Sequence, residues 1–145
     1  ANGFVLNGND ADGESGRSVS CAGDVNGDGV EDLIIGAHWA EPNGRYRAGE
    51  SYVVFGGSGV GAGGSLELSA LNGINGFVLN GIDADDWSGW SVSSAGDVHG
   101  VGVDDVIIGA RLADPKGQAC AGAASYTTLR APETAPLLGG RPRPQ

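Results

Sequence analysis

The chain is poor in basic residues, and this shortage excludes one class of partner. Of its 145 residues, 18 are acidic and 8 are basic, which gives a net charge of −10. Residues 1–129 are more acidic still, because three of the basic residues lie after them. An acidic body repels phosphate backbones, so nucleic acid is not an expected partner. Cations are expected partners, although the negative charge could also serve solubility alone.

Long apolar runs and cysteines are also scarce. No run of 18 apolar residues occurs, so no membrane span is expected. No basic segment followed by an apolar run is visible as a signal peptide, although a secreted protein could have lost one and the sequence could be a piece of a longer chain. Cys21 and Cys120 match no metal or redox spacing, so free thiols are expected. They do not settle the compartment.

What is present is an internal repeat. When the sequence is shifted by 73 positions, residues 2–49 align without gaps on residues 75–122, with 32 identities in 48 positions. The segment Asn-Gly-Phe-Val-Leu-Asn-Gly occurs unchanged at 2–8 and 75–81. Repeats of this length indicate units that stack to bury a shared core.

Each repeat has the pattern of short β-strands separated by Gly-rich turns. In the first, residues 3–8 are apolar and end in Asn-Gly, residues 18–22 alternate in polarity, residues 32–36 are continuously apolar, and residues 50–55 close the unit. No helical periodicity persists, and frequent Gly weakens a helix. Four short strands per repeat are typical of a propeller blade, so we expect an all-β fold of two four-stranded antiparallel blades.

The second repeat departs from the first at its end. Where residues 52–56 close the first set of strands, the second offers Tyr126 to Arg130, and residues 131–145 have no counterpart. Four of the six Pro residues lie in this last segment. We predict repeats at 1–72 and 73–130 and a disordered tail at 131–145, which could also bind a partner.

Residues 24–32, called loop 1 below, carry the pattern with the clearest chemistry. Oxygen-bearing side chains stand at loop positions 1, 3, 5 and 9, and Gly stands at position 6. Ca²⁺ prefers six to eight oxygen ligands, whereas Mg²⁺ demands stricter octahedral geometry. The sequence therefore predicts a calcium site whose ligands are Asp24, Asn26, Asp28, the Val30 carbonyl and Asp32. An Asp- and Gly-rich turn without metal is the alternative.

Two comparisons sharpen this prediction. An EF-hand needs Glu at position 12 and flanking helices, whereas loop 1 has Ile35 there, within a predicted strand. Residues 97–105, called loop 2, keep Asp97 and Asp105 at positions 1 and 9 but have His99 and Val101 at positions 3 and 5. Val101 offers no oxygen and imidazole suits softer metals, so we expect a weak or absent second site.

Residues 23–37, followed by residues 48–56, resemble the FG-GAP repeat of integrin α-chain propellers, and most closely the repeats of bacterial secreted or surface proteins. The resemblance covers about residues 1–130. It implies a β-propeller in which a calcium loop joins the first two strands of each blade, with the loop 1 ligands named above. It also implies an extracellular or cell-surface location.

The sequence departs from that family in two respects. Ser15-Gly16 and Ser88-Gly89 stand where the family has Phe-Gly, which weakens the expected packing between blades. Family propellers have about seven blades and this chain supplies two. Because unpaired strand edges recruit other strands, we expect a piece of a longer protein or an oligomeric ring.

Other candidate residues have simpler explanations. Acidic residues before the second strand of each repeat could bind a second cation but fit solvated turns; they are Asp10, Asp12, Asp83, Asp85 and Asp86. Three Trp residues near loops could bind sugar or a protein partner, or could pack between blades. They are Trp39, Trp87 and Trp90.

No catalytic constellation is recognisable, since His38 and His99 have no nucleophile in a known context, so we do not expect an enzyme. The expected function is a calcium-stabilised adhesion or protein-recognition module whose variable loops 38–48 and 111–121 bind the ligand. The alternatives are a carbohydrate-binding lectin and a structural spacer without a ligand. Self-association is expected unless the sequence is part of a longer repeat protein.

Overall fold

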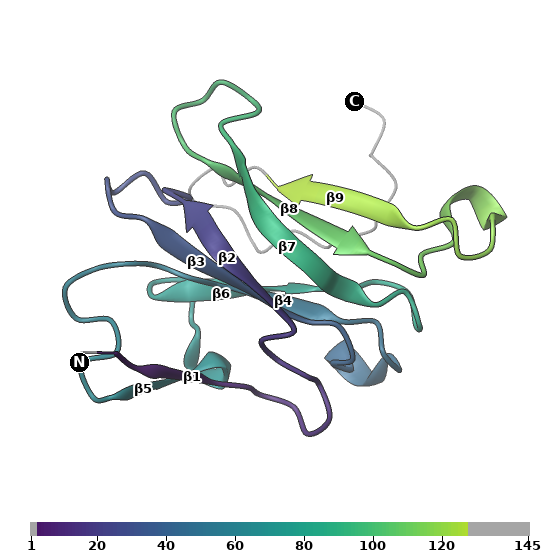
Figure 1. Cartoon of the computed structure of the whole chain (residues 1–145), viewed down its shortest axis with the longest axis horizontal. Coiled ribbons are helices and arrows are strands. Elements are labelled where there is room, and N and C mark those ends of the chain that lie inside the picture. Colours follow the sequence, from purple (N-terminus) through teal and green to yellow (C-terminus); the bar gives the residue numbers. More distant parts are fainter. Residues whose placement is uncertain (1–2, 128–145) are drawn as a thin grey trace.

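A computed structural model describes residues 3–127, and its regular elements in that range are β-strands and short 3₁₀ turns (Figure 1). The strands are β1 (Val5–Asn7), β2 (Ser18–Gly23), β3 (Asp32–Ala37), β4 (Glu50–Val54), β5 (Ser65–Glu67), β6 (Gly76–Asn80), β7 (Ser88–Gly96), β8 (Asp105–Ala110) and β9 (Ala123–Thr127). The turns are η1 (Pro42–Gly44), η2 (Leu68–Ala70) and η3 (Pro115–Gly117). The expected all-β class is confirmed, and the tail predicted at 131–145 lies outside the described residues.

The first sheet has four antiparallel strands in the order β2-β3-β4-β6. Its outer strand, β6, comes from the second repeat, so one repeat completes the sheet of the other. The second sheet has three strands within residues 3–127, β7-β8-β9. A second four-stranded blade is therefore not confirmed. β1 has the sequence of β6 but forms a short parallel pair with β5, which the sequence did not predict.

Strand register corrects one sequence alignment. Tyr52 lies opposite Ile35 in the first sheet, whereas Ser125 lies opposite Ile108 in the second. Tyr126 therefore takes the place of Val53, not of Tyr52 as the matching tyrosines suggested. Pairing of backbone groups fixes this register, and a shift by one residue turns each side chain to the other face. Tyr126 thus lies on the outer face of the second sheet, 56% exposed.

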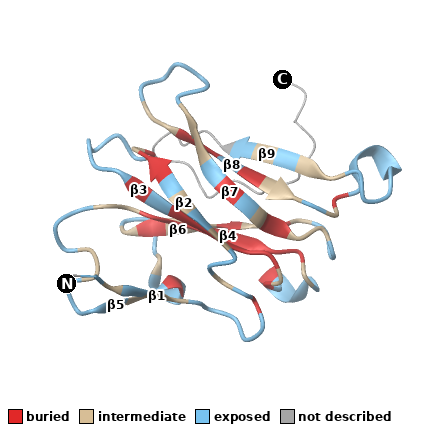
Figure 2. Ribbon diagram, in the orientation of Figure 1, coloured by how far each residue is buried: buried red, intermediate tan, exposed pale blue. Residues whose placement is uncertain are grey.

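Two apolar clusters hold these layers together. The first fills the space between the sheets and contains Ala22, Val25, Ile34, Val53, Leu79, Val92, Val106 and Ile108. The second lies on the other face of the first sheet, where β1, β5 and η2 cover it, and contains Ile35, Ala37, Ala40, Tyr52, Val54 and Leu68. β3 and β4 are buried on both faces, as the continuous apolar run of β3 predicts (Figure 2).

The two sheets approach so closely at one end that backbone contacts backbone. A Cβ atom on Gly36 would collide with the carbonyl oxygen of Gly89, and a Cβ on Gly89 with that of Glu50. The Ser18 hydroxyl also accepts a hydrogen bond of 3.0 Å from the Val92 N–H across the junction. Packing between the sheets therefore rests here on glycine and serine.

The connections divide between the two ends of the sheets (Figure 1). Loop 1 joins β2 to β3 and loop 2 joins β7 to β8, both at one end. The β3–β4 and β8–β9 connections, with η1 and η3, lie at the opposite end. This division separates the predicted metal loops from the predicted recognition loops.

Candidate metal centre

Asp24 organises loop 1 by accepting backbone hydrogen bonds. Its Oδ1 accepts the N–H groups of Gly27 and Asp28 at 2.8 and 3.0 Å, and its Oδ2 accepts that of Gly29 at 2.9 Å. Gly27 and Gly29 have φ values of 79° and 83°, which side chains rarely adopt. The loop thus wraps around the first carboxylate.

The side chains at positions 3 and 5 meet each other at the surface. Asn26 donates from Nδ2 to Asp28 Oδ2 at 3.1 Å and accepts the Asp28 N–H through Oδ1 at 3.1 Å. Asp28 Oδ1 accepts the Val30 N–H at 2.8 Å. Both side chains are exposed, so their remaining lone pairs face solvent.

Asp32 is fully buried and holds the base of the loop. Its Oδ2 accepts the Val25 N–H and its Oδ1 accepts the Gly56 N–H, both at 2.8 Å. Burial raises the pKa of the Asp32 carboxyl, and the two backbone donors oppose that rise. Asp32 therefore ties loop 1 to the end of β4.

The donor set of loop 1 fits a hard cation by its chemistry. Its side chains offer only carboxylate and amide oxygens, which are the ligands that Ca²⁺ prefers. Within residues 3–127, however, no three His, Cys, Asp or Glu side chains are gathered at metal-binding distance. Asn26 and Asp28 are brought together, whereas Asp24 and Asp32 point to backbone donors. Calcium binding by the five predicted ligands, Val30 included, stays a prediction.

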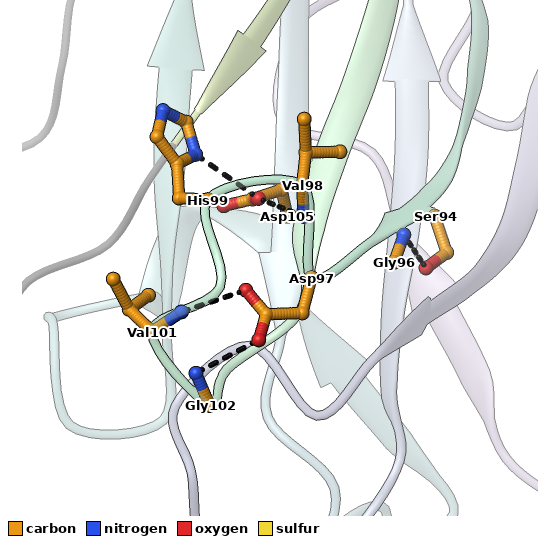
Figure 3. A network of polar contacts seen from close by, with 8 residues as sticks. All are labelled: Ser94, Gly96, Asp97, Val98, His99, Val101, Gly102 and Asp105. Atoms are coloured by element: carbon orange, nitrogen blue, oxygen red, sulfur yellow. Dashed lines mark hydrogen bonds and ion pairs between the residues drawn. The ribbon is translucent and has the colours of Figure 1, made fainter.

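Loop 2 adopts the same fold without oxygen side chains at positions 3 and 5 (Figure 3). Asp97 accepts the N–H groups of Val101 and Gly102 at 3.0 and 2.9 Å, and those donors lower the pKa of Asp97. Asp105 is fully buried and accepts the Val98 N–H at 2.9 Å. His99 Nδ1 lies 3.2 Å from Asp105 Oδ2, so the imidazole contacts the carboxylate at position 9. Positions 1 and 9 therefore shape both loops, whereas the oxygen side chains at positions 3 and 5 are found in loop 1 alone.

Asp104 connects the two loops, a role that sequence reasoning missed. Its Oδ2 accepts the Asp24 N–H at 2.8 Å, and its own N–H donates to the Asp24 carbonyl at 2.9 Å. The matching residue of loop 1, Glu31, instead accepts a hydrogen bond from Cys21 Sγ at 2.8 Å. An acidic residue at position 8 of both loops was the available signal. Order in loop 1 is thereby coupled to the second sheet.

All three tryptophans meet at the opposite end, where the sheets join. The ring centroids of Trp39 and Trp87 lie 6.0 Å apart, and those of Trp87 and Trp90 lie 5.6 Å apart. Each ring also lies within 5.5 Å of the buried His38 imidazole. Trp39 follows β3 of the first sheet, whereas the other two belong to the second repeat. The alternative that these residues pack between blades thus matches their positions.

Three arginines stack on these rings. The guanidinium carbons of Arg17 and Arg111 lie 4.5 and 4.8 Å from the Trp90 centroid, and that of Arg47 lies 4.4 Å from the Trp39 centroid. Such cation–π contacts are worth about 0.5–1 kcal/mol each at exposed sites. We call the six side chains the arginine–tryptophan ladder: Arg17, Trp39, Arg47, Trp87, Trp90 and Arg111. Sequence reasoning found the tryptophans but not the arginines that cover them.

His38 lies at the centre of the ladder and is 1% exposed. Burial lowers the pKa of the imidazole, which Glu14 partly opposes from 3.4 Å. The neutral ring therefore acts as an aromatic spacer between the indoles.

Asp86 makes this end of the protein sensitive to pH. Burial, and then the neighbouring carboxylates of Asp83, Asp114 and Asp85, raise the pKa of Asp86 from 3.8 to about 6. Because the folded state holds this proton more tightly than the unfolded state, the associated stability is present at low pH and is lost as the pH rises through about 6. Asp86→Asn should therefore raise the melting temperature near pH 7 by a few degrees and change it little near pH 4.

Thermal melts at the two pH values check this prediction. Glu41→Gln removes an exposed carboxylate and serves as the control, with little change expected at either pH. An equal gain for Asp86→Asn at both pH values would show that the buried charge is not the cause.

Comparison with known protein families gives one match. Residues 15–54 match the family model of the FG-GAP repeat. This segment is similar to an FG-GAP repeat. It contains β2, loop 1, β3 and β4, which are the elements that hold Asp24 to Asp32. No curated protein matches the chain.

Several general properties are known for the FG-GAP family. The FG-GAP repeat is a non-enzymatic repeat family, typical of extracellular proteins and often related to adhesion, and its members commonly bind Ca²⁺. The described residues are consistent with its all-β propeller architecture. Among them, no helix is long and apolar enough to cross a bilayer.

Proposed function

We propose that this chain is a calcium-binding β-propeller repeat module of a secreted or surface protein, and that it acts in adhesion or protein recognition. The comparison of the two loops carries the proposal. Both are folded by the same Asp residues at positions 1 and 9, but only loop 1, inside the FG-GAP segment, adds oxygens at positions 3 and 5. Loop 2 keeps its shape without oxygens at these two positions. In loop 1 the two side chains contact each other and the Val30 N–H, and a bound metal gives their outward-facing oxygens a role.

The bound ion would act as a structural clamp and not as a catalyst. Asp24, Asn26, Asp28, Asp32 and the Val30 carbonyl would hold it. A divalent cation supplies positive charge that offsets repulsion among three carboxylates. Since Asp104 contacts the backbone of loop 1, the clamp would also steady the junction between the sheets. The recognition loops at the other end would then rest on a stiffer frame.

Asp28→Ala tests the metal site, because Asp28 is exposed and its loss leaves one backbone group, the Val30 N–H, to water. Wild-type protein stripped of metal should show one strong calcium site by calorimetry. The variant should lose about 100-fold or more in affinity, since removal of a residue even outside the ligand shell costs 10–100-fold. At 100 times the dissociation constant, calcium should stabilise the wild type by about 2.7 kcal/mol.

Val101→Ala, at the same position of loop 2, is the matched control. It should change neither the calcium affinity nor the stabilisation by calcium. Asp32→Ala separates binding from folding, because it strands two buried N–H groups and should destabilise the protein even in EGTA. A wild type that binds no calcium, or two ions equally well, would contradict the proposal as stated.

The lectin alternative rests on the three tryptophans. A glycan array probed with and without EGTA separates the two functions, and a specific sugar hit that is lost on substitution of Trp39, Trp87 and Trp90 would favour the lectin. Failure of every ligand screen would favour the structural spacer. The arginines that lie over the three indole rings argue against the lectin.

Self-association is also proposed, and the repeat supports it. The second sheet packs on the first through Val92 and Val106, and their repeat equivalents Val19 and Leu33 line an open pocket of about 310 Å³ on the part of the first sheet that β1, β5 and η2 leave uncovered. Val19 is 64% exposed and Leu33 is 38% exposed. The receiving face of the first sheet includes Ile34 and Val53. The equivalent Ile107 and Tyr126 are exposed on the second sheet. A second copy could therefore repeat part of the internal contact, whereas Ile35, the equivalent of Ile108, is already covered by β1, β5 and η2.

A further inference from the structure

Positive charge in the described residues is confined to the end that carries the ladder. The basic side chains within residues 3–127 are Arg17, Arg45, Arg47, Arg111 and Lys116. All five lie before β2 or in the β3–β4 and β8–β9 connections. Loops 1 and 2, at the other end, contain acidic residues and no basic ones. The basic side chains therefore gather at one end, where acidic residues before β2 and β7 and in both connections lie as well, so the ladder is a group of guanidiniums within a mixed-charge surface.

The arginines of the ladder have no carboxylate partner in the described part of the chain. The close contacts between basic and acidic side chains within residues 3–127 join His38 to Glu14 and His99 to Asp105, and neither involves an arginine. A guanidinium that stacks on an indole still directs its N–H donors outward in its own plane. That plane matches a carboxylate, which can accept two parallel hydrogen bonds.

The same stacking disfavours a sugar. A pyranose ring binds by lying on an open indole face, but arginines lie over the rings of Trp39, Trp87 and Trp90. Trp, Tyr and Arg are instead the residue types that dominate binding energy at protein interfaces. Tyr46, 51% exposed and 4.9 Å from the Arg47 guanidinium, extends the surface with the third of these types.

The backbone holds two ladder residues in a conformation that the other repeat shares. Arg47 and Trp87 have φ values of 47° and 57°, and their repeat equivalents Cys120 and Glu14 have 50° and 52°. Such left-handed residues are uncommon outside glycine and asparagine. The two copies therefore present different side chains on one fixed loop geometry, which is the arrangement expected of a recognition surface on a repeat frame.

We propose that the arginine–tryptophan ladder binds a protein partner by taking an Asp or Glu side chain of that partner between its guanidinium groups and indole rims. This inference rests on the proposed recognition function and names the chemistry of its ligand. Because the body as a whole is acidic, a long acidic tract would be repelled. The partner therefore presents an isolated carboxylate in a neutral or basic surface.

A random peptide library displayed on phage provides the probe. Peptides selected on the wild-type chain should share one Asp or Glu. In a synthetic peptide of this kind, the acidic residue is then replaced by the matching amide. This change should weaken binding to the wild type at least tenfold. It should weaken binding to Arg17→Gln or Arg111→Gln less than twofold. Arg45→Gln removes a nearby charge that stacks on no tryptophan, and should leave affinity within about twofold.

Two further arms keep the outcome decisive. Arg111→Lys retains the charge but not the planar fork, so it should recover less than half of the lost binding free energy; full recovery would overturn the bidentate contact. If Arg17→Gln lowers the melting temperature strongly, Arg17→Lys replaces it. Melting curves of each variant in the same buffer show whether the sheet junction survives.

Other outcomes overturn the proposal. The proposal fails if the selected peptides share no acidic residue. It also fails if replacing that acid by its amide weakens binding equally on the wild type and on both arginine variants. A selection that yields no binding peptide would also overturn the proposal. This holds even if a uronate glycan binds the wild type and fails to bind the arginine variants. If peptides still bind in EGTA and calorimetry detects no calcium binding, the proposal for the ladder is supported. The calcium part of the proposed function is then contradicted.

Discussion

The double substitution His99→Asn and Val101→Asp should give loop 2 a calcium site. Both residues are exposed, and the loop that carries them is already folded by Asp97 and Asp105 as loop 1 is folded by its own aspartates. The substitutions supply the two oxygens that distinguish loop 1. Calorimetry should therefore count two ions where the wild type binds one, and the melting temperature in calcium should rise further.

The single variants serve as controls for this graft. Val101→Asp alone adds the missing charge but leaves the imidazole 3.2 Å from Asp105, so it should bind calcium more weakly than the double variant. His99→Asn alone should bind little, because position 5 stays apolar. A double variant with an unchanged ion count would mean that positions 3 and 5 do not decide binding, and the assignment of loop 1 would lose its main support.

The shape of the two loops was the part of the structure most accessible from sequence. Aspartates at positions 1 and 9 and the glycines that allow positive φ act within nine residues, so their spacing encodes their contacts directly. Asp104 was missed because its partner, the Asp24 backbone, lies 80 residues away. Nothing in the spacing of residues within a loop reports a contact between two loops.

The same limit applies to the strands and to the ladder. The segment 75–81 reads as a strand, and β6 is one, but only the paired sheet shows that it completes the first repeat's sheet next to β4. β1 has the same sequence and pairs with β5 instead, so local pattern does not determine the partner. Arg17 and Arg111 lie far apart in sequence and meet at Trp90 because the sheets pack face to face.

Gly36→Ala should destabilise the chain strongly, whereas Gly109→Ala, its repeat equivalent, should not. A Cβ on Gly36 would strike the Gly89 backbone in the second sheet, and that backbone cannot turn away as a side chain can. We expect a loss of about 3 kcal/mol or more in the free energy of unfolding, because overpacking that forces backbone shifts costs this much. A Cβ on Gly109 would meet only the Ser91 side chain, which can rotate, so the change should stay within about 1 kcal/mol.

Denaturant unfolding of the two variants tests this contrast, and Gly59→Ala, which meets no atom within 4 Å, is a neutral control. Equal losses for Gly36→Ala and Gly109→Ala in dilute solution would show that close approach of the sheets is not what makes Gly36 necessary.

The pair also tests self-association, because Gly109 lies on the outer face with Ile107 and Tyr126, where a second copy would repeat the contact that Gly36 makes. Light scattering of the wild type at high concentration should give a molar mass above the 14.4 kDa of one chain. Gly109→Ala should return it to that value while leaving the folding of the single chain unchanged. A wild type that stays monomeric at every concentration, or an assembly that Gly109→Ala leaves intact, would rule out this mode of stacking. In that case the face that exposes Val19 and Leu33, and the face that exposes Ile107 and Tyr126, would need a partner of another kind.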